Sequence, residues 1–140
     1  MPRNTLTGAV LEDTVVPALR RNGYNFVVQQ NVGASFTGKK HRADVVINLS
    51  ETTRTIVSVK WQQSAGTAEE KVPFEIIKLI HAVKSSVDAI PYAYLILAGT
   101  GWSLKNFYMS QGLRPYIVDY DLVRIISLDE FITRANRKQL

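Results

Sequence analysis

Cysteine is absent from this sequence of 140 residues, and histidine occurs only twice, as His41 and His81. Without cysteine the chain can form neither a disulfide bond nor a zinc site with cysteine ligands, and thiolate catalysis is excluded. The two histidines do not have the spacing of a histidine metal motif. A metal site built on sulfur or imidazole is therefore not expected.

Long apolar runs are absent as well. No stretch approaches the roughly 18 residues of a membrane-spanning helix, and the first residues lack the apolar segment of a signal peptide. We therefore expect a soluble, cytoplasmic protein without a membrane partner. Because the sequence contains neither internal repeats nor low-complexity linkers, residues 1–140 are predicted to form a single domain.

Positive charge is in excess over negative charge. The 17 Lys and Arg residues outnumber the 12 Asp and Glu residues, for a formal net charge of +5 and an isoelectric point near 9.6. This balance favours a polyanionic partner, although charge alone does not specify a fold. With 46% hydrophobic and 21% charged residues, the chain has the composition of an ordinary globular protein.

Two runs of strand-forming residues lie near the centre of the chain, at residues 43–49 and 55–61. Both are rich in Val, Ile and Thr, and the polar residues 50–54 between them predict a β-hairpin. With the turn centred on Thr52, Asp44 would lie directly opposite Lys60. Side chains opposite one another in an antiparallel pair are about 5 Å apart at Cβ.

Polar side chains gather on one face of this hairpin. The period of two along a strand places Ser58, Lys60 and Gln62 on the same face, across from Asp44. One interpretation is the solvated side of an antiparallel sheet. The other is a metal-dependent phosphodiesterase site, in which a carboxylate holds a divalent cation beside a lysine. The residues alone leave both interpretations open, because structural ion pairs give the same pattern.

The order of Asp44 on one strand and Ser58-Val59-Lys60 on the next resembles the motif of the PD-(D/E)XK nuclease superfamily. Restriction endonucleases, Holliday junction resolvases and some homing endonucleases belong to this superfamily. The resemblance covers most of the chain, from an N-terminal helix that carries Glu12 to the strand after the second helix. It implies an α/β fold with a restriction-endonuclease-like core, in which helices flank a mixed central β-sheet.

Two residues depart from the motif. Ala43 stands where the family often has proline, and Ser58 stands where it usually has the second acidic residue. Some family members with serine at this position recruit a carboxylate from the following helix. The available candidates in this chain are Glu69, Glu70 and Glu75. The alternative is that the protein has lost cleavage and only binds DNA.

The resemblance implies a Mg²⁺-dependent endodeoxyribonuclease, in which Mn²⁺ would substitute for Mg²⁺. Asp44 would bind the metal together with the carbonyl oxygen of Val59. A further carboxylate would complete the oxygen shell, and its candidates are Glu12, Glu70 and Glu75.

The resemblance also assigns catalytic roles around the metal. Lys60 would position or deprotonate the attacking water and stabilise charge in the transition state. Ser58 and Gln62 would hold water or phosphate oxygens, and Glu12 would face the same site from the first helix. The expected substrate is double-stranded or branched DNA. A restriction-type or homing endonuclease is favoured over a Holliday junction resolvase, because loops next to the helices could host base contacts.

Basic and polar residues on both sides of the hairpin are candidates for DNA contact. A glycine-containing loop over residues 33–40 leads into a run of four potentially cationic residues, which would be an ordinary solvated turn in another protein but could clamp the DNA backbone here. That run consists of Lys39, Lys40, His41 and Arg42. The segment that follows the hairpin also borders the predicted site. Its candidates for substrate contact are Gln63, Thr67 and Lys71, although Thr67 could equally cap a helical turn with Glu70.

The remaining pattern predicts helices and strands in alternation. Glu12 is expected on the apolar face of the first helix, where it would be paired inside the fold or directed at a metal, or else would lie at a rim that touches solvent. Pro17 should bend that helix or shift its start. Ser127 with Glu130 forms a capping box that opens the last helix. Helices are predicted over residues 5–22, 73–86 and 102–111. Strands are predicted over residues 24–31, 92–98, 116–120 and 122–126.

A homodimer or higher homo-oligomer is predicted on two grounds. Cleavage of both DNA strands needs two active sites, and two-fold symmetry would match a palindromic target. The helix predicted around residues 102–111 is rich in large apolar side chains, which makes it the candidate interface.

Overall fold

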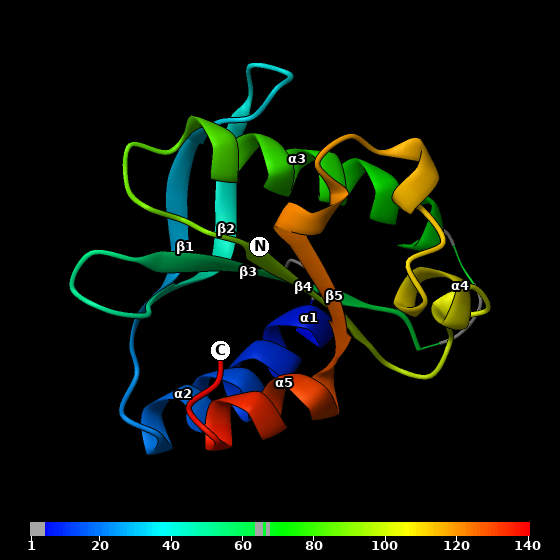
Figure 1. Cartoon of the computed structure of the whole chain (residues 1–140). Coiled ribbons are helices and arrows are strands. Elements are labelled where there is room, and N and C mark those ends of the chain that lie inside the picture. Colours follow the sequence, from blue (N-terminus) through cyan, green and yellow to red (C-terminus); the bar gives the residue numbers. More distant parts are fainter. Residues whose placement is uncertain (1–4, 64–65, 67) are drawn as a thin grey trace.

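The computed structural model describes residues 5–63, 66 and 68–140 of the chain. Its centre is a five-stranded sheet in which the strands follow the order of the sequence (Figure 1). Strands β1 (Asn25–Ala34), β2 (Lys40–Asn48) and β3 (Arg54–Trp61) form an antiparallel meander. Strands β4 (Ala93–Ala98) and β5 (Val123–Ser127) continue the sheet parallel to β3. The sheet is therefore mixed, as predicted.

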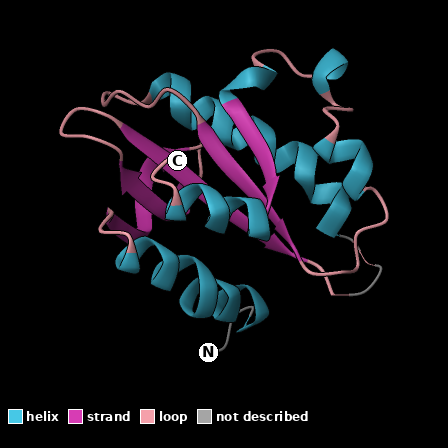
Figure 2. Cartoon of the chain, turned by 60° about the horizontal axis from the view of Figure 1, so that its bottom comes forward, coloured by secondary structure: helices cyan, strands magenta, loops and turns pink. Residues whose placement is uncertain are grey.

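Helices cover both faces of this sheet. The N-terminal helical segment consists of α1 (Thr5–Val10), the π-helical turn η1 (Leu11–Val15) and α2 (Val16–Arg21), and it lies on one face with α5 (Leu128–Asn136). Helix α3 (Val72–Ser85), preceded by the 3₁₀ turn η2 (Ala68–Lys71), covers the opposite face. Figure 2 shows the terminal helices side by side in front of the strands. The predicted α/β fold, with helices flanking a mixed sheet, is confirmed.

Two apolar layers hold these elements together, one on each side of the sheet. Val57, Val59 and Ile96 pack against the terminal helices. Ile56 and Leu95 belong to the other layer, which lies against α3. Strand β4 is buried along its whole length because both of its faces are covered, which explains its continuous apolar sequence.

The predicted N-terminal helix is present but contains a wider turn than expected. The π-helical turn at residues 11–15 ends two residues before Pro17. Proline cannot donate the hydrogen bond that an α-helix requires, and its ring displaces the carbonyl of the preceding turn. Glu12 is exposed, which corrects the prediction of a place within the apolar face and matches the alternative of a rim that touches solvent.

The C-terminal third differs from the prediction at residues 116–120. This segment is not a strand but connects two 3₁₀ turns, η3 (Arg114–Tyr116) and η4 (Tyr120–Leu122). Tyr116 and Val118 are 79% and 82% exposed. Their side chains favour a strand only where they pack against neighbouring strands, and among the described residues they have no such neighbours. Asp119 adopts a left-handed conformation with φ of 62°, which interrupts an extended chain.

The other predicted elements are present. Helix α4 is limited to Lys105–Met109, within the predicted range 102–111. The predicted cap of α5 is confirmed, because the Ser127 hydroxyl accepts a hydrogen bond from the Glu130 N–H. Among the described helices, none has the length and apolar character that a membrane span requires.

Candidate active site

The hairpin of β2 and β3 pairs in a different register from the predicted one. Val45 lies opposite Val57, and Asn48 lies opposite Arg54. This register is shifted by two residues from the one that would pair Asp44 with Lys60, and the paired residues end at Val45 and Val57, just before Asp44. The faces of the strands are unaffected, because a slip of two residues preserves the alternation of side chains.

The turn of the hairpin explains this register. The N–H groups of Leu49 and Ser50 both donate hydrogen bonds to the Thr53 carbonyl. The Ser50 hydroxyl in turn accepts hydrogen bonds from the N–H groups of Thr52 and Thr53. These local bonds close the turn before Arg54 and so centre it on Glu51 rather than Thr52.

Asp44 binds the backbone of the neighbouring strand just beyond this ladder. Its Oδ2 accepts a hydrogen bond of 2.7 Å from the Val59 N–H. The N–H and carbonyl of one strand residue face the same neighbouring strand. The Val59 carbonyl is therefore directed toward the Asp44 side of the strand.

Glu75 reaches the same site from the first turn of α3. The Ser58 hydroxyl donates a hydrogen bond of 2.8 Å to Glu75 Oε2. Glu75 Oε1 lies 3.4 Å from Lys60 Nζ and 3.8 Å from Lys78 Nζ. The carboxylate is only 7% exposed, so these partners replace most of its solvent. Of the three glutamates in residues 69–75, Glu75 is the one that contacts the motif residues Ser58 and Lys60.

The two carboxylates have opposite pKa shifts. Burial raises the pKa of Asp44, and the charge of Glu75 adds to this effect, against the opposing influence of the Val59 hydrogen bond and Lys60. Burial by itself would also raise the pKa of Glu75. The ammonium groups of Lys60 and Lys78, with the Ser58 hydrogen bond, outweigh burial and hold the pKa of Glu75 below its ordinary value.

His41 differs from the prediction because β2 begins at Lys40. Residues 40–42, predicted as part of an exposed basic run, belong to β2, so their side chains alternate between the two faces of the strand. Lys40 and Arg42 are exposed, whereas His41 is buried. Burial and the nearby charge of Lys78 lower the pKa of His41, which favours a neutral imidazole. His41 is therefore removed from the predicted exposed cationic run.

The other sequence-predicted residues have varied surroundings. Gln62 is buried, and its Nε2 donates a hydrogen bond of 2.8 Å to the Gly101 carbonyl. Glu69 is also buried, and it accepts hydrogen bonds of 2.7 Å from the Ser103 hydroxyl and the Leu104 N–H. Thr67 lies outside the described residues. The exposed candidates are Glu12, Lys39, Gln63, Glu70 and Lys71.

One member of the cluster was not predicted as a site residue. Lys78 follows Glu75 by three residues on α3 and pairs with the same oxygen as Lys60. The signal in the sequence is this spacing, since residues three apart on a helix are neighbours. It became meaningful only when Glu75 was placed beside Ser58.

The oxygen atoms of this site suit a magnesium ion better than a metal ion whose ligands all come from the protein. Among the described residues, no group of three or more carboxylate or imidazole side chains is arranged to hold a metal. Asp44 and Glu75 provide two carboxylates, and the charge of Glu75 is felt by Asp44. Mg²⁺ typically binds one or two carboxylates and completes its shell with water and substrate phosphate. Two carboxylates and a backbone carbonyl therefore suit it.

Comparisons with known proteins bear on this site. The family model of the PD-(D/E)XK nuclease superfamily domain matches residues 3–139. No curated protein matches the chain significantly in sequence.

Two solved structures are similar in fold. A protein of unknown function, AF1548, matches with a TM-score of 0.52 and 9% identity, over 81% of this chain and 54% of its own. The small subunit of the heterodimeric restriction endonuclease R.BspD6I matches with a TM-score of 0.45 and 15% identity, over 88% of this chain and 64% of its own. The chain thus spans about half of the first structure and less than two thirds of the second. With the family model matching nearly the whole length, the chain belongs to the PD-(D/E)XK nuclease superfamily.

Proposed function

We propose that the protein is a Mg²⁺-dependent endodeoxyribonuclease in which Glu75 replaces the acid that the motif lacks at Ser58. One observation carries this proposal. The Ser58 hydroxyl binds Glu75 at 2.8 Å, and Lys60 lies 3.4 Å from the same carboxylate. A helix residue thereby brings a carboxylate to the point on β3 where the family motif usually carries one.

Asp44, Glu75 and the Val59 carbonyl are the residues that would hold Mg²⁺, with Mn²⁺ as a substitute. When bound, such an ion stabilises negative charge on a phosphate and lowers the pKa of a coordinated water. The hydrogen bond from the Val59 N–H fixes the Asp44 carboxylate against β3. The Ser58 hydroxyl does the same for Glu75, so both carboxylates are held before a metal arrives.

Lys60 would act on the attacking water and on the phosphate. Its side chain is 32% exposed, which leaves the ammonium accessible from solvent while it pairs with Glu75. From this position it can donate hydrogen bonds to the water or to a phosphate oxygen and stabilise the charge that develops there. Lys78 provides Glu75 with a second cation when Lys60 turns toward substrate.

The proposed substrate is double-stranded or branched DNA. Exposed cations suit contact with the phosphate backbone, which supplies most of the sequence-independent affinity for nucleic acid. They are Lys39, Lys40, Arg42 and Lys71. We expect a restriction-type or homing endonuclease, with a structure-selective enzyme of the Holliday junction resolvase type as the alternative. A catalytically inactive DNA-binding module is the rival of a different class.

A plasmid-nicking assay with Mg²⁺ tests the proposal. We expect cleavage by the native protein and its loss in Asp44→Ala and Lys60→Ala, with DNA binding largely retained in both. Cleavage at a near-native rate by either variant would refute the proposed site. Binding without cleavage by the native protein, with Mg²⁺ or Mn²⁺, would support the inactive module.

Separate glutamine substitutions identify the third ligand. Glu75→Gln should abolish cleavage, whereas Glu12→Gln and Glu70→Gln are matched controls because both side chains are exposed. A double substitution, Ser58→Glu with Glu75→Ser, would return the acid to β3 and should restore part of the activity that Glu75→Gln loses. Full activity in all three single variants would refute the recruited carboxylate.

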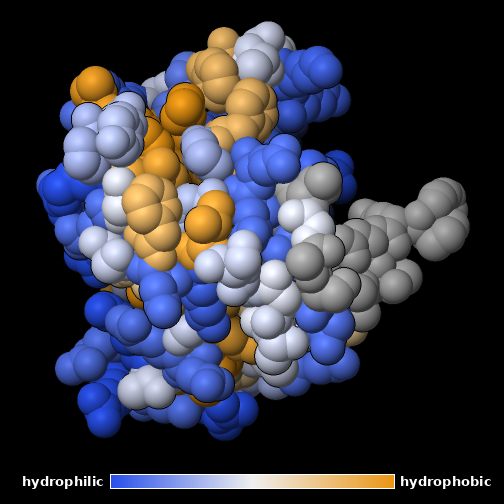
Figure 3. Space-filling model, turned by 90° about the vertical axis from the view of Figure 1, so that its right-hand side faces the viewer, coloured by the Kyte–Doolittle hydropathy of each residue, from blue (hydrophilic) through white to orange (hydrophobic). Residues whose placement is uncertain are grey.

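We further propose that the protein forms a homodimer through the surface around residues 102–111. Trp102 and Tyr108 are buried within their own chain, so they do not belong to this surface. Leu104 and Phe107 are 44% and 43% exposed. Figure 3, which faces the side where α4 lies, shows apolar side chains reaching the surface among polar ones. Sedimentation at micromolar concentration should give a dimer, and a monomer both free and on DNA would refute it.

A further inference from the structure

Two phenylalanine side chains meet at the surface next to the candidate active site. Phe36 comes from the loop between β1 and β2, and Phe74 comes from the first turn of α3. Their ring centroids are 5.3 Å apart with an angle of 55° between the ring planes. Phe36 remains 45% exposed and Phe74 50% exposed, and Ile77, one turn along α3, is 40% exposed. Single exposed apolar residues are common, but these three are contiguous.

The loop that carries Phe36 has a defined conformation. The Ser35 N–H donates a hydrogen bond of 2.7 Å to the Lys39 carbonyl. The hydroxyls of Ser35 and Thr37 are 2.7 Å apart, and Ser35 itself is buried. Gly38 has a φ of 88°, a conformation that favours glycine and closes the loop. The loop therefore holds Phe36 against Phe74 and places Lys39 nearby in the chain.

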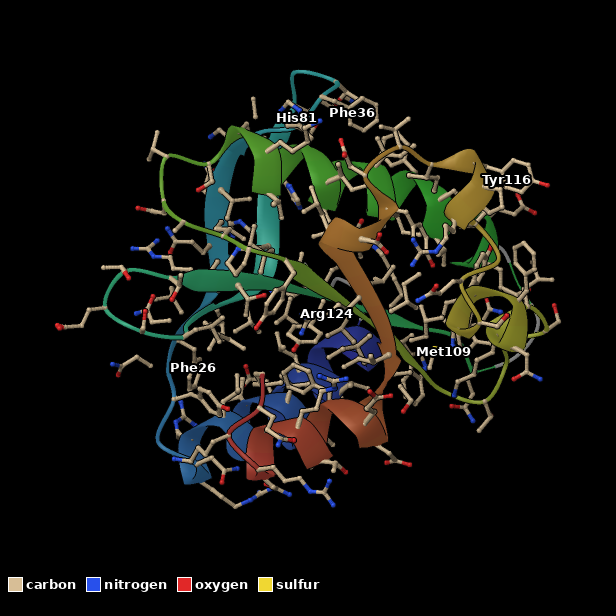
Figure 4. All side chains as sticks on the ribbon, viewed as in Figure 1. Phe26, Phe36, His81, Met109, Tyr116 and Arg124 are labelled. Atoms are coloured by element: carbon tan, nitrogen blue, oxygen red, sulfur yellow. The ribbon has the colours of Figure 1, made fainter. Side chains whose placement is uncertain are left out.

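The aromatic pair adjoins the proposed site through one lysine. Phe74 directly precedes Glu75, and Lys78 pairs with Glu75 at 3.8 Å. Around the axis of an α-helix, Lys78 is about 40° and Glu75 about 100° from Phe74. Lys78 thus lies between the aromatic surface and the carboxylate. In Figure 4, Phe36 lies beside α3 near His81, whereas Tyr116 lies at a different end of the molecule.

The chemistry of this surface is that of a site for an unpaired nucleobase. Proteins bind single-stranded nucleic acid by stacking bases on aromatic side chains while cations contact the backbone. Here exposed aromatic faces lie next to Lys78 and to the loop that carries Lys39. In an intact duplex the faces of the bases are covered by their neighbours. A base could therefore reach Phe36 and Phe74 only where pairing and stacking are interrupted.

We propose that Phe36 and Phe74 stack on an unpaired base close to the scissile phosphate. The substrate would then be DNA with a flap, junction or bulge, which favours the structure-selective alternative over a restriction-type or homing endonuclease. This inference rests on the proposed function, whose substrate it narrows. It predicts a preference in binding as well as in cleavage, so it can be tested without catalysis.

The test measures DNA binding in the Asp44→Ala background, with two DNAs that differ only in pairing. In one, a single 2-aminopurine is unpaired within a duplex, and in the other the same base is paired. Phe36→Leu and Phe74→Leu should each weaken binding to the unpaired DNA by about 5-fold to 150-fold, the range that loss of one stacking contact produces. Binding to the paired DNA should change less than about two-fold. Phe74→Trp should retain the preference.

Fluorescence gives a second readout. The emission of the unpaired 2-aminopurine should change when a protein that retains Phe74 binds the DNA. When the Phe74→Leu variant binds, the emission should stay the same. Tyr116→Leu is a matched control, because Tyr116 is an aromatic side chain that is 79% exposed and remote from Phe36. Tyr116→Leu should alter neither the affinity for the unpaired DNA nor the change in 2-aminopurine emission on binding.

The competing explanation is that the two rings only fasten the loop to α3. In that case the leucine variants would lose thermal stability but bind both DNAs alike, and this result would overturn the inference. The outcome is independent of catalysis. If the native protein does not cleave DNA but the leucine variants lose selective binding, the proposed function fails and the stacking site stands. If it cleaves paired and unpaired DNA equally and binds them equally, the nuclease stands and the stacking site fails.

Discussion

Replacement of Glu75 by glutamine provides the sharpest test of the electrostatic description of the site. Glutamine has nearly the same shape and can still accept the hydrogen bond from Ser58. It removes the negative charge and, with its oxygen kept on Ser58, turns an NH2 group toward Lys60 and Lys78, which lie 3.4 Å and 3.8 Å from the native carboxylate. The change therefore reports on the charge and not on packing.

The expected loss of stability follows from the exposure of the three partners. Breaking a fully buried ion pair costs about 3–5 kcal/mol, whereas exposed pairs contribute about 0–1 kcal/mol. Glu75 is 7% exposed, but Lys60 and Lys78 are 32% and 25% exposed and can turn toward water. We therefore expect a loss of about 1–3 kcal/mol, between those limits. For a chain of this size that is a drop in Tm of roughly 3–12 °C.

The pH dependence gives this prediction a sign that can be checked. The pKa of Glu75 is lower in the folded protein than its ordinary value of 4.5, so the folded state binds the proton less readily than the unfolded state. The stability that Glu75 contributes is thus complete above pH 4.5 and is lost as the pH falls through the folded pKa. The gap between native protein and Glu75→Gln should close in acid.

Urea denaturation in the presence of EDTA, at several pH values, measures this gap. Glu70→Gln is the control, because Glu70 is exposed and should change the free energy of unfolding by less than about 0.5 kcal/mol. The reasoning is refuted if Glu75→Gln is as stable as the native protein at pH 7. A gap that widens in acid would refute it equally.

Four further substitutions should alter stability in ways that denaturant unfolding can measure. Asp44→Asn should raise the free energy of unfolding at pH 7 by about 0.5–2 kcal/mol, because burial raises the pKa of Asp44 and disfavours its ionised form in the folded protein. The gain should vanish in acid, where Asp44 is protonated in both the folded and the unfolded protein. Gly99→Ala should cost more than about 2 kcal/mol, because its φ is 95° and a Cβ there would lie 2.4 Å from the Gln62 carbonyl oxygen. Gly38→Ala should cost only the backbone strain of about 1–2 kcal/mol, because its φ is 88° but the space around it is open. Ser127→Ala should cost about 1 kcal/mol, because it removes the cap of α5.

Much of the fold could be predicted from local patterns. The runs rich in Val, Ile and Thr form β2 and β3, and the continuous apolar run around residues 92–98 forms the buried strand β4. The cap at Ser127 opens α5 as expected. These predictions depend on periodicity and on contacts between residues close in sequence, which the local sequence encodes directly.

Predictions that depended on the exact path of the backbone were less accurate. The N-terminal helix contains a π-helical turn before Pro17, and Glu12, which lies within that turn, is exposed. The Ser50 hydroxyl tightened the hairpin turn, and the pairing of β2 with β3 is shifted by two residues from the predicted register. Residues 116–120 have strand-forming side chains but found no neighbouring strand. In each case hydrogen bonds or sheet pairing decided between conformations that the side chains alone permit.

The sequence by itself determined that Ser58 and Lys60 share one face of β3, because alternation along a strand is a property of the backbone. Only the tertiary structure decided which carboxylate joins them. Glu69, Glu70 and Glu75 are equivalent candidates in the sequence, but Glu69 binds the segment after β4 and Glu70 is exposed. Glu75 reaches Ser58 because the apolar layer between α3 and the sheet sets the rotation of the helix, and that packing involves residues far apart in the chain.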